Sequence, residues 1–153
     1  MRRGVRLGLD IGTVRIGVAV SDVEGILATP HSTVQRSADN YEEQLRGLCE
    51  RLDVLEVLVG LPLALSGSMT ASTRDALAVA SALQSQINVD VRMIDERLTT
   101  VSAHSALRQV GKKQKQTRQV IDQVAAVLIL QHSLEIERAQ GTVPGKLIGD
   151  IQD

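Results

Sequence analysis

Apolar residues follow a strand-like pattern in the first third of the chain. Residues 5–10 and 14–22 alternate or run apolar, as buried strands do, and residues 26–34 form a weaker third segment. Pro30 places that third strand at an edge of the sheet, because proline cannot donate to a ladder of hydrogen bonds. Since only short links separate the three segments, we expect an antiparallel meander.

Beyond this meander the pattern changes to helical spacing and then alternates between helix and strand. Apolar residues recur every three or four positions in the predicted helices, and they run continuously in the short segments rich in β-branched residues. The pattern predicts helices over residues 40–52, 71–87, 100–110 and 117–139, and strands over residues 54–60 and 89–94.

This order of elements predicts one α/β domain over residues 1–140, followed by a flexible tail over residues 141–153. Strands that alternate with helices after a meander form a mixed sheet with helices on both faces. Right-handed crossovers then place the two later strands beside the first strand. We therefore expect a five-stranded sheet in the order 3-2-1-4-5, with strand 2 antiparallel.

Composition narrows the class of protein. With a net charge of −1 and 43% hydrophobic residues, the 153-residue chain is typical of a globular protein. No apolar run reaches the roughly 18 residues of a membrane span, so we expect a cytoplasmic protein without membrane contact. The single Cys49 excludes an internal disulfide and falls on an apolar helical stripe, which predicts a thiol in the core. Because Tyr41 is the only aromatic residue, nucleic acid would be bound through phosphates and metal rather than by stacking.

Three carboxylates fall where the predicted fold would bring them together. Asp10 ends the first strand and Glu96 follows the fifth, and the carboxyl ends of parallel strands share one edge, where ligands bind. Asp122 shares a helix face with small and apolar residues, so it should point inward. Ligand sets of oxygen alone suit Mg²⁺ or Mn²⁺. Two such ions would clamp a phosphodiester for attack by water, so we predict that these acids are both metal ligands and catalytic residues.

Charged side chains between Glu96 and Asp122 are all basic. A basic arm beside an acidic metal site suits a nuclease, because the arm can hold phosphates while the metals act on one of them. The basic residues of this segment are Arg97, Arg108, Lys112, Lys113, Lys115 and Arg118.

Each acid also has a simpler explanation when it is considered alone. Asp10 could cap a turn, and Glu96 could pair with Arg97. Asp122 could complement the helix dipole or pair with Arg118 one turn earlier. Chance explains the joint placement of all three acids less easily, which favours the metal site.

Four motifs occur in order over residues 5–135. They are Asp10-x-Gly12-x-x-Arg15-Ile16-Gly17, Gly60-Leu61-Pro62, Asp95-Glu96-Arg97-Leu98-Thr99-Thr100 and Asp122-x-x-Ala125-Ala126. Together they resemble the RuvX (YqgF) family of the RNase H-like superfamily, whose members are described as Holliday junction resolvase-like proteins and as pre-16S ribosomal RNA nucleases.

This resemblance implies an RNase H-like fold and a metal-dependent endonuclease of the bacterial cytoplasm. Carried over residue by residue, it makes Asp10, Glu96 and Asp122 the catalytic acids and puts Arg15 and Arg97 near the scissile phosphate. The loop after Pro62 differs, because Ala64 and Leu65 stand where the family often has Asn and Asp.

Two substrates remain open at this point, the 5′ end of pre-16S rRNA and a four-way DNA junction. A resolvase cuts two strands symmetrically and should be a homodimer, whereas an RNA-processing enzyme could act as a monomer. The main alternative is a non-catalytic nucleic-acid-binding or ribosome-assembly module. The first motif is also similar to the phosphate loop of actin-like ATPases and sugar kinases, but a chain of 153 residues lacks their second half.

Overall fold

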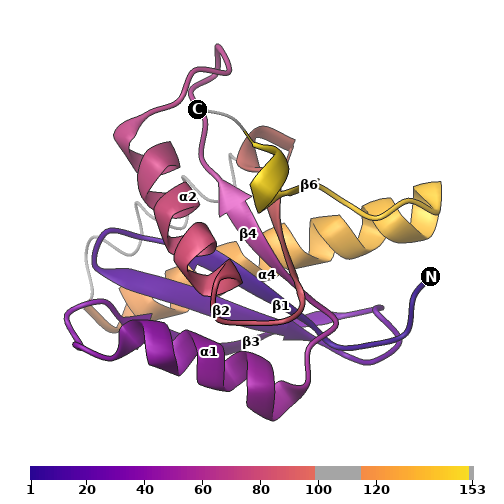
Figure 1. Cartoon of the computed structure of the whole chain (residues 1–153), viewed down its shortest axis with the longest axis horizontal. Helices are drawn as coiled ribbons and strands as arrows, with labels where there is room; N and C mark the ends of the chain where they lie inside the picture. Colours follow the sequence, from indigo (N-terminus) through magenta and orange to yellow (C-terminus); the bar gives the residue numbers. More distant parts are fainter. Residues whose placement is uncertain (99–114, 152–153) are drawn as a thin grey trace.

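The protein forms one mixed sheet that carries helices on both faces (Figure 1). The computed structural model describes residues 1–98 and 115–151, with the side chains of residues 115–120 left out. Its strands are β1 (Arg6–Ile11), β2 (Arg15–Ser21), β3 (Ala28–Gln35), β4 (Glu56–Leu61), β5 (Asp90–Asp95) and β6 (Lys146–Leu147). Its α-helices are α1 (Tyr41–Leu52), α2 (Ala71–Gln84) and α4 (Lys115–Gln140), and η1 (Glu96–Leu98) and η2 (Ile148–Asp150) are 3₁₀ turns.

The strand order β3-β2-β1-β4-β5-β6 confirms the predicted order of the first five strands. Strands β1, β4 and β5 are parallel, and β2 is antiparallel to both of its neighbours. Pro30 lies in the edge strand β3, opposite Ala19 and beside an irregularity in the register, as its missing N–H requires.

A sixth strand corrects the predicted number of five. Strand β6 pairs antiparallel with β5 and comes from the segment after Gly141 that was expected to be a tail. It has only two residues, too few to produce a hydrophobic period that a sequence pattern could reveal. The helix predicted over residues 100–110 lies outside the described residues.

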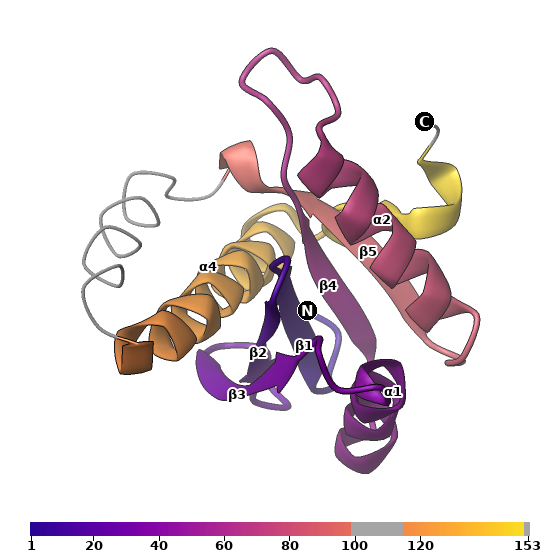
Figure 2. The same cartoon turned by 90° about the vertical axis from the view of Figure 1, so that its left-hand side faces the viewer.

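Helices lie on the two opposite sides of the sheet (Figure 2). A separate hydrophobic cluster fills each side. Helices α1 and α2 cover the larger cluster, which includes Cys49, and burial raises the pKa of this thiol to about 11. The predicted core position of Cys49 is thereby confirmed. Helix α4 covers the other face, and in the described part of the chain no helix is long and apolar enough to cross a membrane.

Helix α4 lies unusually close to the sheet because two strand positions are glycines. A Cβ atom on Gly17 would lie 2.0 Å from the backbone oxygen of Asp122, and one on Gly8 would lie 2.8 Å from the Cβ of Leu130. Strands β1 and β2 therefore contact the backbone of α4 in a way that any larger residue would prevent. This contact fixes the depth of Asp122 relative to the sheet.

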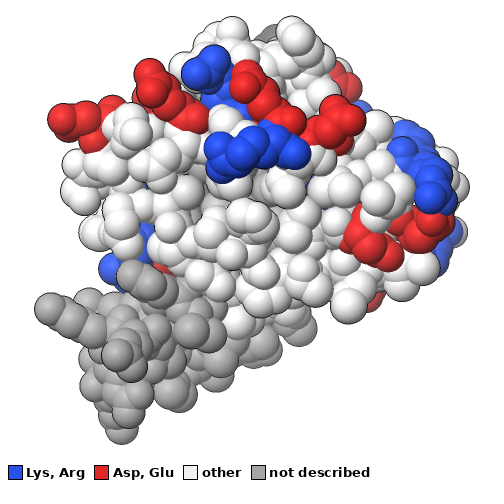
Figure 3. Space-filling model, turned by 90° about the horizontal axis from the view of Figure 1, so that it is seen from below, with Lys and Arg blue, Asp and Glu red and all other residues white. Residues whose placement is uncertain are grey.

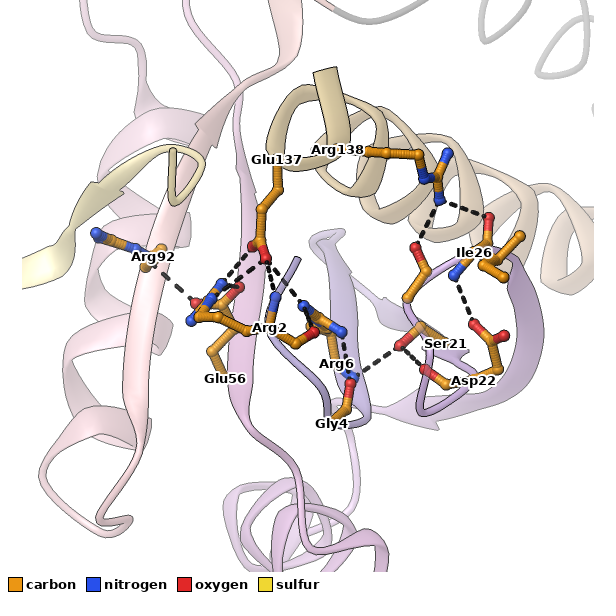
Figure 4. Close-up of polar contacts among 11 residues, drawn as sticks. Arg2, Gly4, Arg6, Ser21, Asp22, Ile26, Glu56, Arg92, Glu137 and Arg138 are labelled. Carbon is orange, nitrogen blue, oxygen red and sulfur yellow. Dashed lines mark hydrogen bonds and ion pairs between the residues drawn. The ribbon is translucent and has the colours of Figure 1, made fainter. Parts of the chain in front are cut away.

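A buried ion cluster ties the other end of the sheet together, where the parallel strands begin (Figure 4). Glu137 of α4 accepts hydrogen bonds from Arg2 Nη2 at 2.5 Å and from Arg6 Nη2 at 3.1 Å. Arg2 also donates to Glu56 at the start of β4, at 2.7 Å. Because Arg6, Glu56 and Glu137 are almost fully buried, their charges depend on one another for compensation.

Candidate active site

A polar cavity of about 300 Å³ opens where β1, β4 and β5 end. Its wall includes all three acids predicted from the sequence, which come from three separate elements. The lining residues are Asp10, Ile11, Gly12, Thr13, Val14, Arg15, Pro62, Ser72, Asp75, Glu96 and Asp122. The predicted crossovers thus bring together residues that are far apart in the chain.

Asp10 is the most deeply placed of the three acids. It lies in β1 opposite Gly17 of β2, and only 5% of it is exposed. Burial of an ionised carboxylate is costly unless the surroundings compensate the charge. The same Gly17 admits the backbone of α4 at Asp122, so a single glycine brings Asp10 and Asp122 to one region of the fold.

Glu96 reaches the cavity across the neighbouring strand. It follows β5 as the first residue of η1, and its carboxylate lies over Gly60 of β4. A Cβ atom on Gly60 would be 2.7 Å from Oε1 of Glu96. The absence of a side chain at Gly60 therefore gives Glu96 the space to reach the cavity wall.

Asp122 projects from the interior of α4 and is about one-fifth exposed. Its Oδ2 accepts a hydrogen bond of 2.8 Å from Nε of Arg15, the first residue of β2. Because α4 begins at Lys115, about two turns earlier, Asp122 is too far from the helix start to act mainly on the dipole. Asp122 thus pairs with Arg15 across the cavity. The sequence also suggested Arg118 as a partner, but the structure does not describe the side chain of Arg118.

The donor chemistry of the cavity suits Mg²⁺ or Mn²⁺, because its three candidate ligands are carboxylates. Within the described residues, however, no group of three or more His, Cys, Asp or Glu side chains is already arranged to hold an ion. Arg15 already engages one of the three acids, Asp122. A divalent ion bound by all three acids would therefore compete with Arg15 for Asp122.

Arg97 contacts a different surface from the one expected. Its guanidinium pairs with Asp95 at 2.7 Å, donates to the carbonyl of Leu65 at 3.3 Å, and lines an apolar groove beside the cavity. Hydrogen bonds from Arg97 lower the pKa of Asp95, although burial opposes this. Of the two arginines predicted near the scissile phosphate, the structure places Arg15 in the cavity wall and Arg97 outside it.

The predicted basic arm is largely outside the described part of the chain. Arg108, Lys112 and Lys113 are not among the described residues, and Lys115 and Arg118 belong to α4 with their side chains undescribed. On the face seen in Figure 3, acidic and basic side chains lie near one another with uncharged surface between them. The described residues of that face therefore form no continuous basic patch.

The sequence analysis missed two charged residues at the cavity, Asp75 and Arg36. Asp75 lines the cavity from the first part of α2, and Arg36 follows β3 and forms a two-pronged ion pair with it. Asp75 lies within a predicted helix and Arg36 follows a predicted strand. Nothing in the sequence around either residue indicates that the two side chains form a pair.

Known proteins resemble this chain in sequence over most of its length. The sequence profile of the RuvX family, described as Holliday junction resolvase, matches residues 4–136. The chain belongs to the RuvX family. A relative from Leifsonia xyli, provisionally named pre-16S rRNA nuclease, is 57% identical over 146 residues, which cover 95% of this chain and 94% of the relative. A relative from Mycobacterium sp. (strain KMS) with the same provisional name is 50% identical, covering 94% of this chain and 87% of the relative. These names indicate a nuclease.

A solved structure supports the fold assignment for this RuvX-family member. Thermus thermophilus RuvC in complex with a Holliday junction substrate matches with a TM-score of 0.62 and 17% sequence identity. The match covers 94% of this chain and 99% of RuvC. At that identity the likeness establishes a shared RNase H-like fold and says nothing further about activity.

Proposed function

We propose that this RuvX-family protein is a metal-dependent endonuclease that hydrolyses phosphodiester bonds in structured nucleic acid. The observation that carries the proposal is the meeting of Asp10, Glu96 and Asp122 in one cavity at the carboxyl ends of the sheet. These acids come from β1, η1 and α4. Gly60 leaves space for the side chain of Glu96, and Gly17 allows the backbone of α4 at Asp122 to approach the sheet closely. A protein that only binds nucleic acid gains nothing from three carboxylates in such a cavity, because they repel phosphate.

In this proposal Asp10, Glu96 and Asp122 hold Mg²⁺ or Mn²⁺, with two ions as the expected number. The bound ions would supply a water of lowered pKa and neutralise charge on the phosphate. Arg15 is the protein's own cation in the cavity wall. Once released from Asp122, its guanidinium can donate hydrogen bonds to a phosphate oxygen and hold the substrate over the acids.

The proposed substrates are the 5′ end of pre-16S rRNA and the four-way DNA junction. The first is in the names of the relatives and the second is in the description of the family. A junction resolvase must cut two symmetric strands, so activity on junctions requires a homodimer. Cleavage of an RNA end makes no such demand, so the mass of the active species would help to separate the two activities.

The Arg15–Asp122 ion pair is the observation that favours the alternative, a non-catalytic nucleic-acid-binding or ribosome-assembly module. If the pair is permanent, Oδ2 of Asp122 is not available to a metal ion and Nε of Arg15 is not available to a phosphate. The two functions differ in one measurable respect, because only the endonuclease binds Mn²⁺ through these acids.

The test is a side-by-side cleavage assay on a pre-16S rRNA 5′ end and a four-way DNA junction, with Mg²⁺, with Mn²⁺ and with EDTA. We expect the unmodified protein to cleave at least one substrate only when metal is present. Asp10→Asn should lower the rate at least about a hundredfold, because even residues that merely support metal ligands contribute 10- to 100-fold.

Asp90→Asn is the matched control, since Asp90 is an exposed aspartate at the opposite end of β5 from the cavity. It should cleave at the same rate as the unmodified protein. Equal activity of Asp10→Asn, or a rate unaffected by EDTA, would exclude the proposed mechanism. Binding of either nucleic acid without cleavage under any metal condition would favour the alternative.

A further inference from the structure

The turn between β1 and β2 forms one wall of the cavity and carries Arg15 at its end. The backbone N–H of Gly12 donates to the carbonyl of Arg15 at 2.9 Å, closing a tight turn around Thr13 and Val14. All four residues line the cavity. Asp10 lies just before the turn, so the position of the turn also affects the entrance above that acid.

Arg36 holds this turn at two separate points. Its backbone N–H donates to the carbonyl of Val14 at 2.9 Å. Its side chain donates from Nη1 to the carbonyl of Gly12 at 2.8 Å. Because the two carbonyls lie on either side of the tip, Arg36 restrains both the start and the end of the turn.

Asp75 fixes the guanidinium that makes the second contact. Its Oδ2 accepts from Nη1 of Arg36 at 2.6 Å and its Oδ1 accepts from Nη2 at 2.9 Å. The ring centroid of Tyr41, the only aromatic residue in the sequence, lies 5.5 Å from the guanidinium carbon, which adds a cation–π contact. Arg36 is 17% exposed and Asp75 is 32% exposed, so water screens the pair only in part.

The helix that carries Asp75 is itself anchored to the cavity. Thr70 caps α2 by accepting a hydrogen bond from the backbone N–H of Thr73. The hydroxyl of Thr73 in turn accepts from the backbone N–H of Thr70 and donates to the carbonyl of Pro62, which also lines the cavity. Asp75 therefore projects from a helix start that is held in place independently of Arg36. Through its ion pair with Arg36, Asp75 therefore restrains the turn relative to this helix.

We propose that the Arg36–Asp75 ion pair is a positioning device that holds the β1–β2 turn, and with it Arg15, in place at the cavity. Contacts run from Asp75 through Arg36 to the turn, and from Arg15 at its end to Asp122 on α4. Both carboxylate oxygens of Asp75 are engaged by Arg36, which assigns this acid to positioning rather than to metal binding. Its effect on catalysis rests on the proposed endonuclease function.

Arg36→Lys is the sharpest test because it keeps the positive charge. Lysine has one ammonium group and cannot reproduce the planar fork to Asp75 together with the bond to Gly12. We expect backbone amides at Gly12 and Arg36 to exchange hydrogen about tenfold faster, because the turn opens more often. The kcat for cleavage should fall about tenfold with KM within about twofold, since small misplacements of catalytic groups affect the reacting geometry.

Two further variants complete the design. Asp75→Asn keeps one oxygen acceptor, so it should change amide exchange and kcat in the same direction but less. Arg46→Lys is the matched control, because Arg46 pairs with Glu50 at 3.7 Å on the exposed side of α1. It should leave both measurements unchanged, and all three variants should melt within about 4 °C of the unmodified protein.

Unchanged amide exchange at Gly12 in Arg36→Lys would overturn the proposal, because the pair would then not hold the turn. Faster exchange with an unchanged kcat would overturn its catalytic part. If the unmodified protein cleaves neither substrate, the endonuclease proposal fails, and the exchange measurement still decides whether the ion pair positions the turn.

Discussion

Arg15 and Asp122 face each other across the cavity and are joined by a hydrogen bond of 2.8 Å from Nε to Oδ2. The pair links the end of the β1–β2 turn to the interior of α4, and each side chain is about one-fifth exposed. Arg15 therefore neutralises one of the three acids. Binding of metal and release of Arg15 toward a phosphate are coupled steps in the proposed function, since both draw on Asp122.

Arg15→Gln separates these two effects. Loss of a positive charge beside the acids should tighten Mn²⁺ binding roughly tenfold, because a like-charge repulsion disappears. Cleavage should nevertheless become slower, since the cation that would hold the phosphate is lost. Calorimetric titration measures the affinity for Mn²⁺, and the cleavage assay measures the rate.

The control for this variant is Arg3→Gln, which removes an arginine from an exposed ion pair with Glu24. It should leave both Mn²⁺ affinity and the cleavage rate unchanged. Weaker Mn²⁺ binding by Arg15→Gln would contradict the idea that Arg15 competes with metal for Asp122.

Gly60→Ala should displace Glu96 from the cavity. The new methyl group would lie 2.7 Å from Oε1 of Glu96 and 2.6 Å from Cδ1 of Ile129, so both flexible side chains must move. We expect a loss of stability of about 1–3 kcal/mol from overpacking. Cleavage should fall at least about tenfold, because metal sites tolerate little displacement of a ligand.

Gly149→Ala is the corresponding control, because a Cβ atom there meets nothing within 4 Å. Urea unfolding and the cleavage assay are the two measurements for both variants. Full activity in Gly60→Ala would show that the placement of Glu96 over Gly60 has no importance for catalysis.

Glu137→Gln should weaken the buried ion cluster at the other end of the sheet. Burial alone would raise the pKa of Glu137, but hydrogen bonds and charge from Arg2, with a smaller contribution from Arg6, lower it below its ordinary value of 4.5. The stabilisation is therefore complete above about pH 4.5 and disappears as the pH falls through the lower value of the folded state. At pH 7 the substitution should cost about 3 kcal/mol, the lower end for a broken buried pair, because Arg2 is partly exposed.

Urea unfolding at pH 7 and at pH 3.5 checks this prediction. The difference between the unmodified protein and Glu137→Gln should shrink at the lower pH, because below about pH 4.5 the carboxyl group of Glu137 takes up a proton more readily in the unfolded chain than in the folded protein. Glu24→Gln, in the exposed pair with Arg3, should cost less than about 0.5 kcal/mol at either pH. A constant difference across this range would mean that the charge of Glu137 is not what stabilises the cluster.

The order of the first five strands was predictable because it depends on local periods and general rules of connection. A strand of six to eight residues shows its apolar pattern, whereas the two residues of β6 do not. The inward direction of Asp122 was likewise predictable, since helix geometry places residues at intervals of three and four on one face. Its partner was not, because the sequence suggests Arg118 one turn earlier and says nothing of Arg15, which is 107 positions away.

The amino-acid sequence by itself determined the alternation of strands and helices, the edge that collects Asp10 and Glu96, and the inward face of Asp122. The geometry of helices and strands sets these features locally, so the spacing of apolar and polar residues along the chain reveals them. Tertiary structure alone decided that Arg15 meets Asp122, that Arg97 turns to Asp95, and that Arg36 and Asp75 support the turn. Such contacts depend on how closely the elements pack, as at Gly17 and Gly60, and packing distance has no counterpart in the spacing of residues along a chain.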